Sequence, residues 1–334
     1  MSVTYEDVVG AARRIAGHVL RTPVLEISPG VFLKLEQLQH SGSFKVRGAF
    51  NRILSAGRLP PSGVIAASGG NHGLAVAHAA RALGVRAEIF VPDVTSPVKI
   101  AGLRALGAEI TQGGAIYSAA AEAAAKRAAE TGALEVHAYD QPEVIAGQGT
   151  TGLELVEQTG GVDTVLVAVG GGGFIAGIAL GVSGATRASL ADHGSGGTLG
   201  DRDTGAGAAL ADRGTATRVV AVEPVLIPTL HDALEAGRPV PVSVSGVAAD
   251  ALGATQLGGL AFEVCSRAGV SSVLVPDEAI VAARRTLWDR HRVVAEHAGA
   301  TAYAALLSGA YTPAPGERVA VMVCGSNTDP ATLA

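Results

Sequence analysis

Lys45 is the residue whose type and surroundings most clearly indicate covalent chemistry. The chain has 25 basic residues, yet only four of them are lysine, so arginine is its usual choice for a positive charge. A lysine amine can form a Schiff base with a carbonyl compound once it loses its proton, whereas a guanidinium stays protonated. Lys45 follows small residues and Phe44, which indicates a candidate covalent anchor. Considered alone, the residue fits an exposed lysine at the start of a helix better.

A first glycine-containing turn, residues 68–73, follows the apolar run 64–67 and precedes an alanine-rich helix. Backbone N–H groups at such a helix start, together with the helix dipole, bind a carboxylate or a phosphate. Asn71 adds a side chain that both donates and accepts hydrogen bonds. A tight strand-to-helix turn with a capping residue explains the same sequence without function, and His72 beside it is more often a packing residue than a base.

A second turn contains four consecutive glycines, Gly170, Gly171, Gly172 and Gly173, after an apolar strand. Consecutive glycines cost chain entropy, which is reasonable where the backbone must wrap closely around an anion such as a phosphate. No Gly-Lys-Ser/Thr follows, so the turn is not a nucleoside-triphosphate P-loop. The spacing of Gly171, Gly173 and Ala176 also fits the dinucleotide-binding pattern, which leaves a nicotinamide-dependent oxidoreductase as an alternative.

Cys324 ends an apolar run near the C-terminus, just before Gly325, Ser326 and Asn327. A free thiol is usually buried and inert, and the functional alternative is a neutral hydrogen-bond partner for a cofactor ring. The other cysteine is Cys265, at no metal-binding or disulfide-framework spacing, which suits a reducing cytosol. No set of histidines and acids has the spacing of a metal site, so we expect no metal.

These residues must be positioned by strands and helices that alternate along the chain. From residue 63 apolar runs alternate with helical patterns through residue 130, and a second such run starts at residue 144. Alternation with short connections predicts a mostly parallel, doubly wound α/β fold, here in two units. Residues 183–216 are rich in small and polar residues and have no apolar periodicity, which predicts a flexible insertion.

The composition excludes several classes of protein. Hydrophobic residues make up 48% of the 334 residues and charged residues 16%, so a large core can form. The formal net charge of −5 argues against nucleic acid or an anionic membrane as a partner. The first residues do not resemble a signal peptide, and the apolar runs are too short and too glycine-broken to span a bilayer. We therefore expect a soluble cytoplasmic protein.

Together, the lysine, the two glycine turns and the strand-end cysteine resemble the fold-type II pyridoxal-phosphate enzymes, specifically the threonine/serine dehydratase (ammonia-lyase) and serine racemase family. The resemblance extends over nearly the whole chain, through residues 21–24, 41–48, 68–73, 146–150, 169–177 and 324–329. It implies two doubly wound parallel-sheet domains of the tryptophan synthase beta type, with pyridoxal 5′-phosphate in the cleft between them. We assign residues 1–52 and 143–334 to the large domain, which includes the insertion, and residues 53–142 to the small domain.

The resemblance also implies a role for each residue at a matching position. Lys45 would bind the cofactor as a Schiff base and then take the substrate's α-proton, and Phe44 would pack beside the ring. Asn71 would bond the phenolic oxygen, and Cys324 would face the pyridine nitrogen as a neutral partner. The phosphate would be bound by Gly170, Gly171, Gly172 and Gly173. The substrate carboxylate would be bound by Ser68, Gly69, Gly70, Asn71 and His72.

The implied reaction is β-elimination, in which a homodimer converts a small β-hydroxy amino acid, L-threonine or L-serine, to a 2-oxo acid and ammonia. Gly69 departs from the serine racemases, which place a second serine there as an acid/base, and this favours dehydration. The family's cation site uses an acid that matches Glu223, but Pro228 and Thr229 stand near the second acid's position, which argues against a bound cation. The alternatives are a racemase, a dehydratase for another 3-hydroxy amino acid such as 3-hydroxyaspartate or phenylserine, and a ligand-sensing relative.

Overall fold

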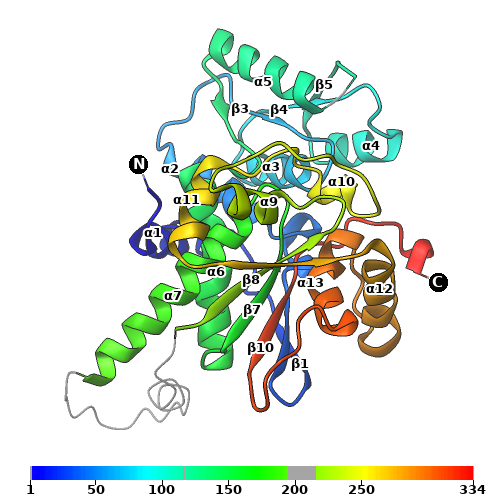
Figure 1. Ribbon diagram of the computed structural model, residues 1–334. Coiled ribbons are helices and arrows are strands. Elements are labelled where there is room, and N and C mark those ends of the chain that lie inside the picture. Colours follow the sequence, from blue (N-terminus) through cyan, green and yellow to red (C-terminus); the bar gives the residue numbers. More distant parts are fainter. Residues whose placement is uncertain (1, 116, 195–215, 334) are drawn as a thin grey trace.

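Two β-sheets, each between layers of helices, form the protein (Figure 1). The computed structural model describes residues 2–115, 117–194 and 216–333. The larger sheet has six strands in the order β1-β2-β10-β7-β8-β9, and all neighbours are parallel except the antiparallel pair β1 and β2. Its strands are β1 (Val24–Ser28), β2 (Val31–Leu35), β7 (Thr164–Ala168), β8 (Arg218–Pro224), β9 (Ser271–Val275) and β10 (Val319–Val323).

Helices cover both faces of the larger sheet. Helix α13 (His297–Ser308) contacts β7 to β10, with α12 (Asp277–His291) packed against it, and Figure 1 shows both on one side of the sheet. On the other side, α7 (Gly173–Gly194) contacts β7 and β8 and packs on α6 (Pro142–Thr159) and α11 (Gly259–Arg267). Strands β7 and β10 are consequently buried along their whole lengths, as is usual for a parallel sheet covered twice.

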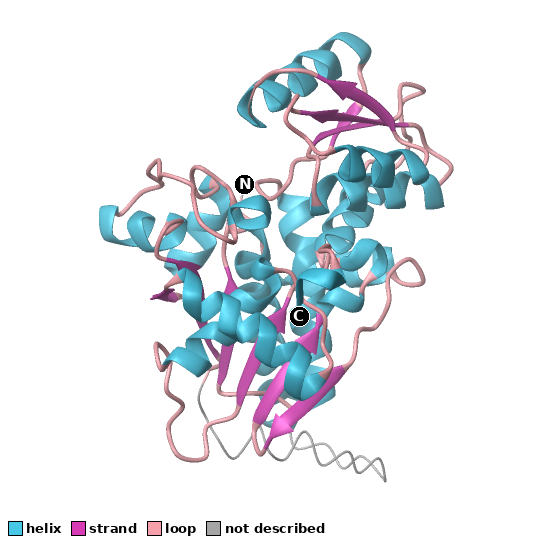
Figure 2. Cartoon of the chain, turned by 90° about the vertical axis from the view of Figure 1, so that its right-hand side faces the viewer, coloured by secondary structure: helices cyan, strands magenta, loops and turns pink. Residues whose placement is uncertain are grey.

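The smaller sheet has four parallel strands in the order β5-β4-β3-β6. They are β3 (Val64–Ala67), β4 (Ala87–Val91), β5 (Glu109–Gln112) and β6 (Leu134–Glu135). Helix α5 (Tyr117–Thr131) lies on one face, and α3 (Asn71–Ala82) and α4 (Pro97–Ala105) lie on the other. Figure 2 shows this layer beyond one end of the larger sheet. The predicted α/β class with two parallel-rich sheets is confirmed, while the predicted domain boundaries stay a prediction.

Helix α2 (Lys45–Ser55) lies where the two layers meet, because it contacts both α6 and α3. It starts at Lys45, so the fold places this lysine between the sheets. The other helices that the structure describes are α1 (Tyr5–Ile15), α9 (Thr229–Ala236), α10 (Ala249–Leu252), η1 (Glu36–Leu38), η2 (His40–Gly42) and η3 (Pro330–Leu333).

A buried cluster of charges fixes helix α2 against the larger sheet. Arg47 Nε donates to Glu36 Oε2 at 2.8 Å, and Arg47 Nη1 donates to Glu154 Oε1 at 2.8 Å. Lys34 Nζ lies 2.8 Å from Glu154 Oε2, and the side chains of Lys34, Glu36 and Arg47 are fully buried. The four residues come from β2, η1, α2 and α6, so their ion pairs hold the first turn of α2, and with it Lys45, in one position.

The predicted insertion at residues 183–216 needs a correction at its start. Helix α7 continues through Gly194, because extending an existing helix is far easier than nucleating a new one. Residues 195–215 lie outside the described part of the chain. Within that part, no helix is both long enough and apolar enough to cross a membrane.

Candidate active site

Lys45 lies at the wall of a cavity between the two sheets. The segment before it is tied to the end of β10, since Phe44 N donates to Cys324 O at 3.2 Å and Ser43 forms a β-bridge with Gly325. Lys45 Nζ donates to Ala138 O at 2.6 Å. The surface that Lys45 still exposes faces the cavity, and desolvation lowers the pKa of its amine from 10.5 to about 8. At pH 7 about one-tenth of this amine is therefore unprotonated, far more than for a lysine with the ordinary pKa.

The four-glycine turn joins β7 to α7 and forms a cradle for an anion, with no room for a side chain at Gly171, Gly172 or Gly173. A Cβ atom on Gly171 would lie 2.3 Å from carbon atoms of the Tyr139 ring, and one on Gly173 would lie 2.5 Å from Tyr139 O. Gly172 has φ +86° and would place a Cβ 2.5 Å from Leu257. The first N–H groups of a helix have no partner inside it. The turn therefore offers donors to a phosphate while Tyr139 and Leu257 fill the space around it.

Cys324 lies at the end of β10, beside Lys45. The thiol is buried, its Sγ donates to Ala298 O at 3.5 Å, and burial raises its pKa far above the usual range. Cys324 is therefore a neutral thiol, as the sequence predicted for the partner of a ring nitrogen. Phe44 stacks on Phe174, with ring centroids 4.0 Å apart, and so forms an apolar wall next to the glycine cradle.

Asn71 is held in one orientation by two other side chains. Its Nδ2 donates to Glu296 Oε1 at 2.6 Å, and its Oδ1 accepts from Asn327 Nδ2 at 2.6 Å. The second proton of Nδ2 stays available to a ligand. Glu296 is buried next to this amide, and desolvation raises its pKa to about 7 despite the hydrogen bond from Asn71. No pattern in the sequence pointed to this contact of Glu296 with Asn71.

The turn at Ser68, Gly69, Gly70, Asn71 and His72 joins β3 to α3. Ser68 Oγ accepts from Gly70 N at 3.1 Å, and a Cβ on Gly73 would lie 2.1 Å from Ser68 O, so the turn is tight. The free N–H groups at the start of a twelve-residue helix suit a carboxylate. The His72 ring is committed elsewhere, because its Nε2 lies 2.8 Å from Val136 O and burial lowers its pKa to about 3. Any contact of His72 with a substrate would therefore use its backbone N–H.

Two adjoining cavities bring all the predicted site residues together. A cavity of about 410 Å³ is lined by Lys45 and by all five residues of the first glycine turn. A narrower cavity of about 40 Å³ is lined by Phe44, Cys324, Glu296 and the four glycines. Lys45, Asn71, Tyr139 and Gly171 line both. The predicted anion turns thus open into one continuous site with Lys45 between them.

Several residues of this site carried no signal in the sequence. Tyr139 covers Gly171, and Thr95 covers Gly69, since a Cβ on Gly69 would lie 2.7 Å from Thr95 Cγ2. Such contacts arise only from the three-dimensional packing of distant segments. A pattern that could have pointed to Tyr139 is its place in the short connection between β6 and the proline-started helix α6.

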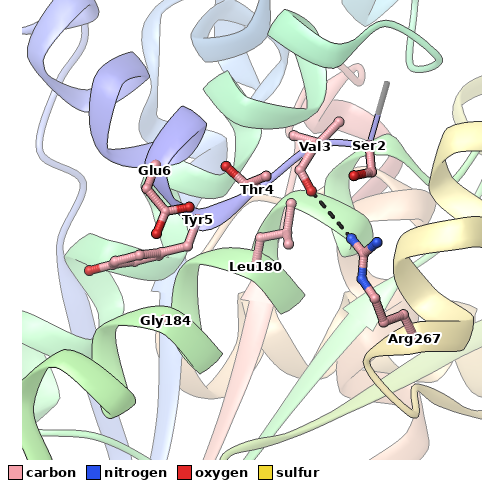
Figure 3. A pocket seen from close by; sticks show the side chains of 8 residues that line it. All are labelled: Ser2, Val3, Thr4, Tyr5, Glu6, Leu180, Gly184 and Arg267. Atoms are coloured by element: carbon pink, nitrogen blue, oxygen red, sulfur yellow. Dashed lines mark hydrogen bonds between the residues drawn. The ribbon is translucent and has the colours of Figure 1, made fainter. Parts of the chain in front are cut away.

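A separate cavity of about 540 Å³ lies near the N-terminus and contains none of the predicted site residues (Figure 3). It is lined by the first residues of the chain, by two residues of α7 and by Arg267, whose Nη2 donates to Val3 O at 3.3 Å. Its volume exceeds that of the 410 Å³ cavity at Lys45, but it lacks the lysine amine and the glycine turns, so we place the active site at Lys45.

Glu223, which matches the family's cation site, has other partners in this chain. Its Oε1 accepts from Leu230 N at 2.7 Å, and its Oε2 accepts from His231 N at 2.9 Å and from Ser272 Oγ at 2.8 Å. The carboxylate thus caps helix α9. No group of three or more potential metal ligands occurs among the described residues.

Comparison with known proteins gives the same assignment. Residues 15–325 match the sequence pattern of a family described as pyridoxal-phosphate dependent enzyme. L-threonine ammonia-lyase of Thermotoga maritima is 34% identical over 335 residues, covering 98% of this chain and 76% of that protein. Phenylserine dehydratase of Ralstonia pickettii is 34% identical over 337 residues, covering 98% of this chain and 94% of that protein. The structure of maize serine racemase is similar with a TM-score of 0.85 and 29% identity, covering 100% of this chain and 96% of that one.

The residues of the site fit the cofactor of that family. A phosphate suits the glycine cradle at Gly171, a pyridine nitrogen suits the neutral thiol of Cys324, and a carbonyl carbon suits the low-pKa amine of Lys45. The dinucleotide alternative for the same glycines leaves Lys45 without a role and is overturned by the family match. The relatives differ in the substrate that their names give, so they show a family rather than a substrate. By sequence, fold and site, the chain belongs to the pyridoxal-phosphate-dependent enzymes, among the threonine dehydratase-like members of that family.

Proposed function

We propose that this protein is a dehydratase that converts a small 3-hydroxy amino acid, L-threonine or L-serine, to a 2-oxo acid and ammonia. The observation that carries the proposal is the position of Lys45. Its amine, with a pKa of about 8, lies at the junction of a carboxylate-sized turn and a phosphate-sized cradle. A base poised near neutral pH is what abstraction of an α-proton requires.

Each part of the site has one task in this proposal. The N–H groups at the start of α7 bind the phosphate of the cofactor, and Phe44 packs against its ring. Asn71, oriented by Glu296, bonds the ring oxygen. Cys324 faces the ring nitrogen as a neutral thiol. When bound, pyridoxal phosphate supplies an electron sink that makes the α-proton of the amino acid acidic.

The substrate is oriented by the first turn of α3. Its carboxylate lies against the N–H groups around Asn71, which directs the α-carbon toward Lys45. The Lys45 amine takes the α-proton, and the Ala138 carbonyl that accepts from Nζ holds the amine in place before the transfer. The β-hydroxyl group then takes a proton from the protonated Lys45 amine and leaves as water, and hydrolysis of the released enamine by one water gives the 2-oxo acid and ammonia.

The surroundings of Gly69 support elimination over racemisation. A racemase needs a second acid/base on the face of the amino acid opposite to Lys45, and the resemblance places it at Gly69. Here Gly69 carries no proton donor, and the Thr95 side chain takes the space that a side chain at position 69 would need. With a base on one face only, the proton is removed and water is lost rather than the proton being returned from the other side.

A substrate panel tests the proposal. The protein loaded with pyridoxal phosphate is given threonine, serine, 3-hydroxyaspartate and phenylserine, and ammonia and 2-oxo acid are measured, with D-serine followed by chiral chromatography. We expect turnover of threonine or serine, no D-serine, and no turnover by the Lys45→Ala variant. Absence of ammonia from every member of the panel would refute the proposal. A preference for 3-hydroxyaspartate or phenylserine would refute threonine and serine as the substrates. The homodimer implied by the resemblance and the cytoplasmic location expected from the composition stay predictions.

A further inference from the structure

Lys99 and Asp250 form an ion pair across the mouth of the cavity at Lys45. Lys99 lies on α4, which packs with the smaller sheet, and Asp250 lies on α10, which contacts α13 beside the larger sheet. Lys99 Nζ donates to Asp250 Oδ1, and both residues line the cavity of about 410 Å³ together with the substrate-carboxylate turn. The reaction steps proposed above use neither residue.

The charges of this pair reach the interior of the site. Asp250 raises the pKa of the buried Glu296 carboxyl and Lys99 lowers it, in addition to the larger effect of desolvation. Glu296 bonds Asn71, so the pair lies within electrostatic range of the residues that orient the substrate. A carboxylate on the substrate's side chain would therefore be sensitive to both charges.

The cavity offers no uncommitted cation to such a carboxylate. Of the residues that line it, all within the described part of the chain, Lys45 and Lys99 are the cations and Asp250 is the acid. Lys45 is the proposed base, and the charge of Lys99 is already matched by Asp250. His72 is kept neutral by burial, which lowers its pKa to about 3. A dicarboxylic amino acid would meet the negative charge of Asp250 without a free positive partner.

We infer that Asp250 excludes dicarboxylic substrates from this site by neutralising Lys99, so that the enzyme selects amino acids with an uncharged side chain. This inference rests on the proposed function and names the substrate class of the same site. Selectivity by an unfavourable charge against the wrong ligand is a common device in specific binding sites. Asp250 therefore determines substrate specificity and does not only link the two layers through its ion pair with Lys99.

Ligands that lack a β-hydroxyl group separate binding from turnover. L-aspartate and L-2-aminobutyrate are titrated into the protein loaded with pyridoxal phosphate, and the change in visible absorption gives the Kd of each. For the Asp250→Asn variant we expect the affinity for L-aspartate relative to L-2-aminobutyrate to rise at least about tenfold over the wild type, because Lys99 is released. Asp289→Asn, an exposed acid on α12, is the control with the same change in net charge and should leave the ratio unchanged.

A second variant assigns the gain to Lys99. In Asp250→Asn combined with Lys99→Met, the preference gained for L-aspartate should disappear. The inference is overturned if Asp250→Asn gains no affinity for L-aspartate relative to L-2-aminobutyrate, or if this gain survives the loss of Lys99. It is also overturned if the wild type already binds L-aspartate more tightly than L-2-aminobutyrate. Failure of the proposed function is seen in a different measurement, because the loaded wild type would then release no ammonia from any member of the substrate panel.

Discussion

The environment of Lys45 predicts that this residue destabilises the protein when the cofactor has been removed. The free amine is desolvated between the two sheets, and its pKa falls from 10.5 to about 8. A lysine with a depressed pKa binds its proton less tightly in the folded than in the unfolded protein. The unfolded protein thus binds more protons between these two values, and the stability of the fold rises with pH through that window.

The magnitude follows from the shift. One pKa unit corresponds to 1.36 kcal/mol, so at neutral pH the desolvated amine costs about 3 kcal/mol. Lys45→Met keeps most of the side-chain volume and removes this cost. It also leaves the Ala138 carbonyl without its donor, a loss of about 1–3 kcal/mol that does not depend on pH. The pH dependence of the difference between the two proteins therefore isolates the ionisation of Lys45.

Urea denaturation of both proteins, stripped of cofactor, measures this difference. From about pH 7 to about pH 9.5, the free energy of unfolding of the wild type should rise by about 2 kcal/mol relative to Lys45→Met. The remaining ionisable groups are common to both proteins and cancel. A difference that stays constant with pH would refute the claim that the amine is desolvated, and so would a difference of the opposite sign.

Three further predictions concern the elements around Lys45. Arg47→Met leaves the carboxylates of Glu36 and Glu154 to share one cation, Lys34, under α2, so the free energy of unfolding measured in urea should fall by about 3–5 kcal/mol; no change would contradict the buried cluster. Gly171→Ala puts a methyl group into the tyrosine ring that covers this glycine, so the affinity for pyridoxal phosphate, measured by absorption titration, should fall at least about tenfold, whereas Gly10→Ala, with open space around it, should not. Gly69→Ser should produce D-serine efficiently only together with Thr95→Ala, which opens the space for the new hydroxyl; equal racemisation by the single variant would show that Thr95 is no obstacle.

The α/β fold and the meeting of the four-glycine turn with Cys324 were predictable from local sequence. The carboxyl ends of parallel strands lie at one edge of a sheet, so turns that follow strands gather there. Gly171 follows β7 and Cys324 follows β10. These two strands are parallel neighbours in the larger sheet, and both residues line the same cavity. The lysine stood out because the chain uses this residue so rarely.

The side chains that orient the site were not predictable in this way. Glu296 reaches Asn71 from 225 positions away, and Lys99 reaches Asp250 from 151 positions away. Their pairing depends on how the two layers of the protein meet, and no local pattern in the sequence encodes that geometry. The contact of the His72 ring with Val136 is of the same kind, although the sequence favoured a packing residue at this position; the role of His72 in binding the substrate carboxylate stays a prediction.

The central claim of this account is that Lys45 binds pyridoxal phosphate covalently, and peptide mapping tests it most directly. The loaded protein is reduced with borohydride and digested, and the pyridoxyl label is located by mass spectrometry. The chain has only four lysines, so the assignment is unambiguous. We predict the label on Lys45 alone; a label on Lys34, Lys99 or Lys126, or no label at all, would contradict the account.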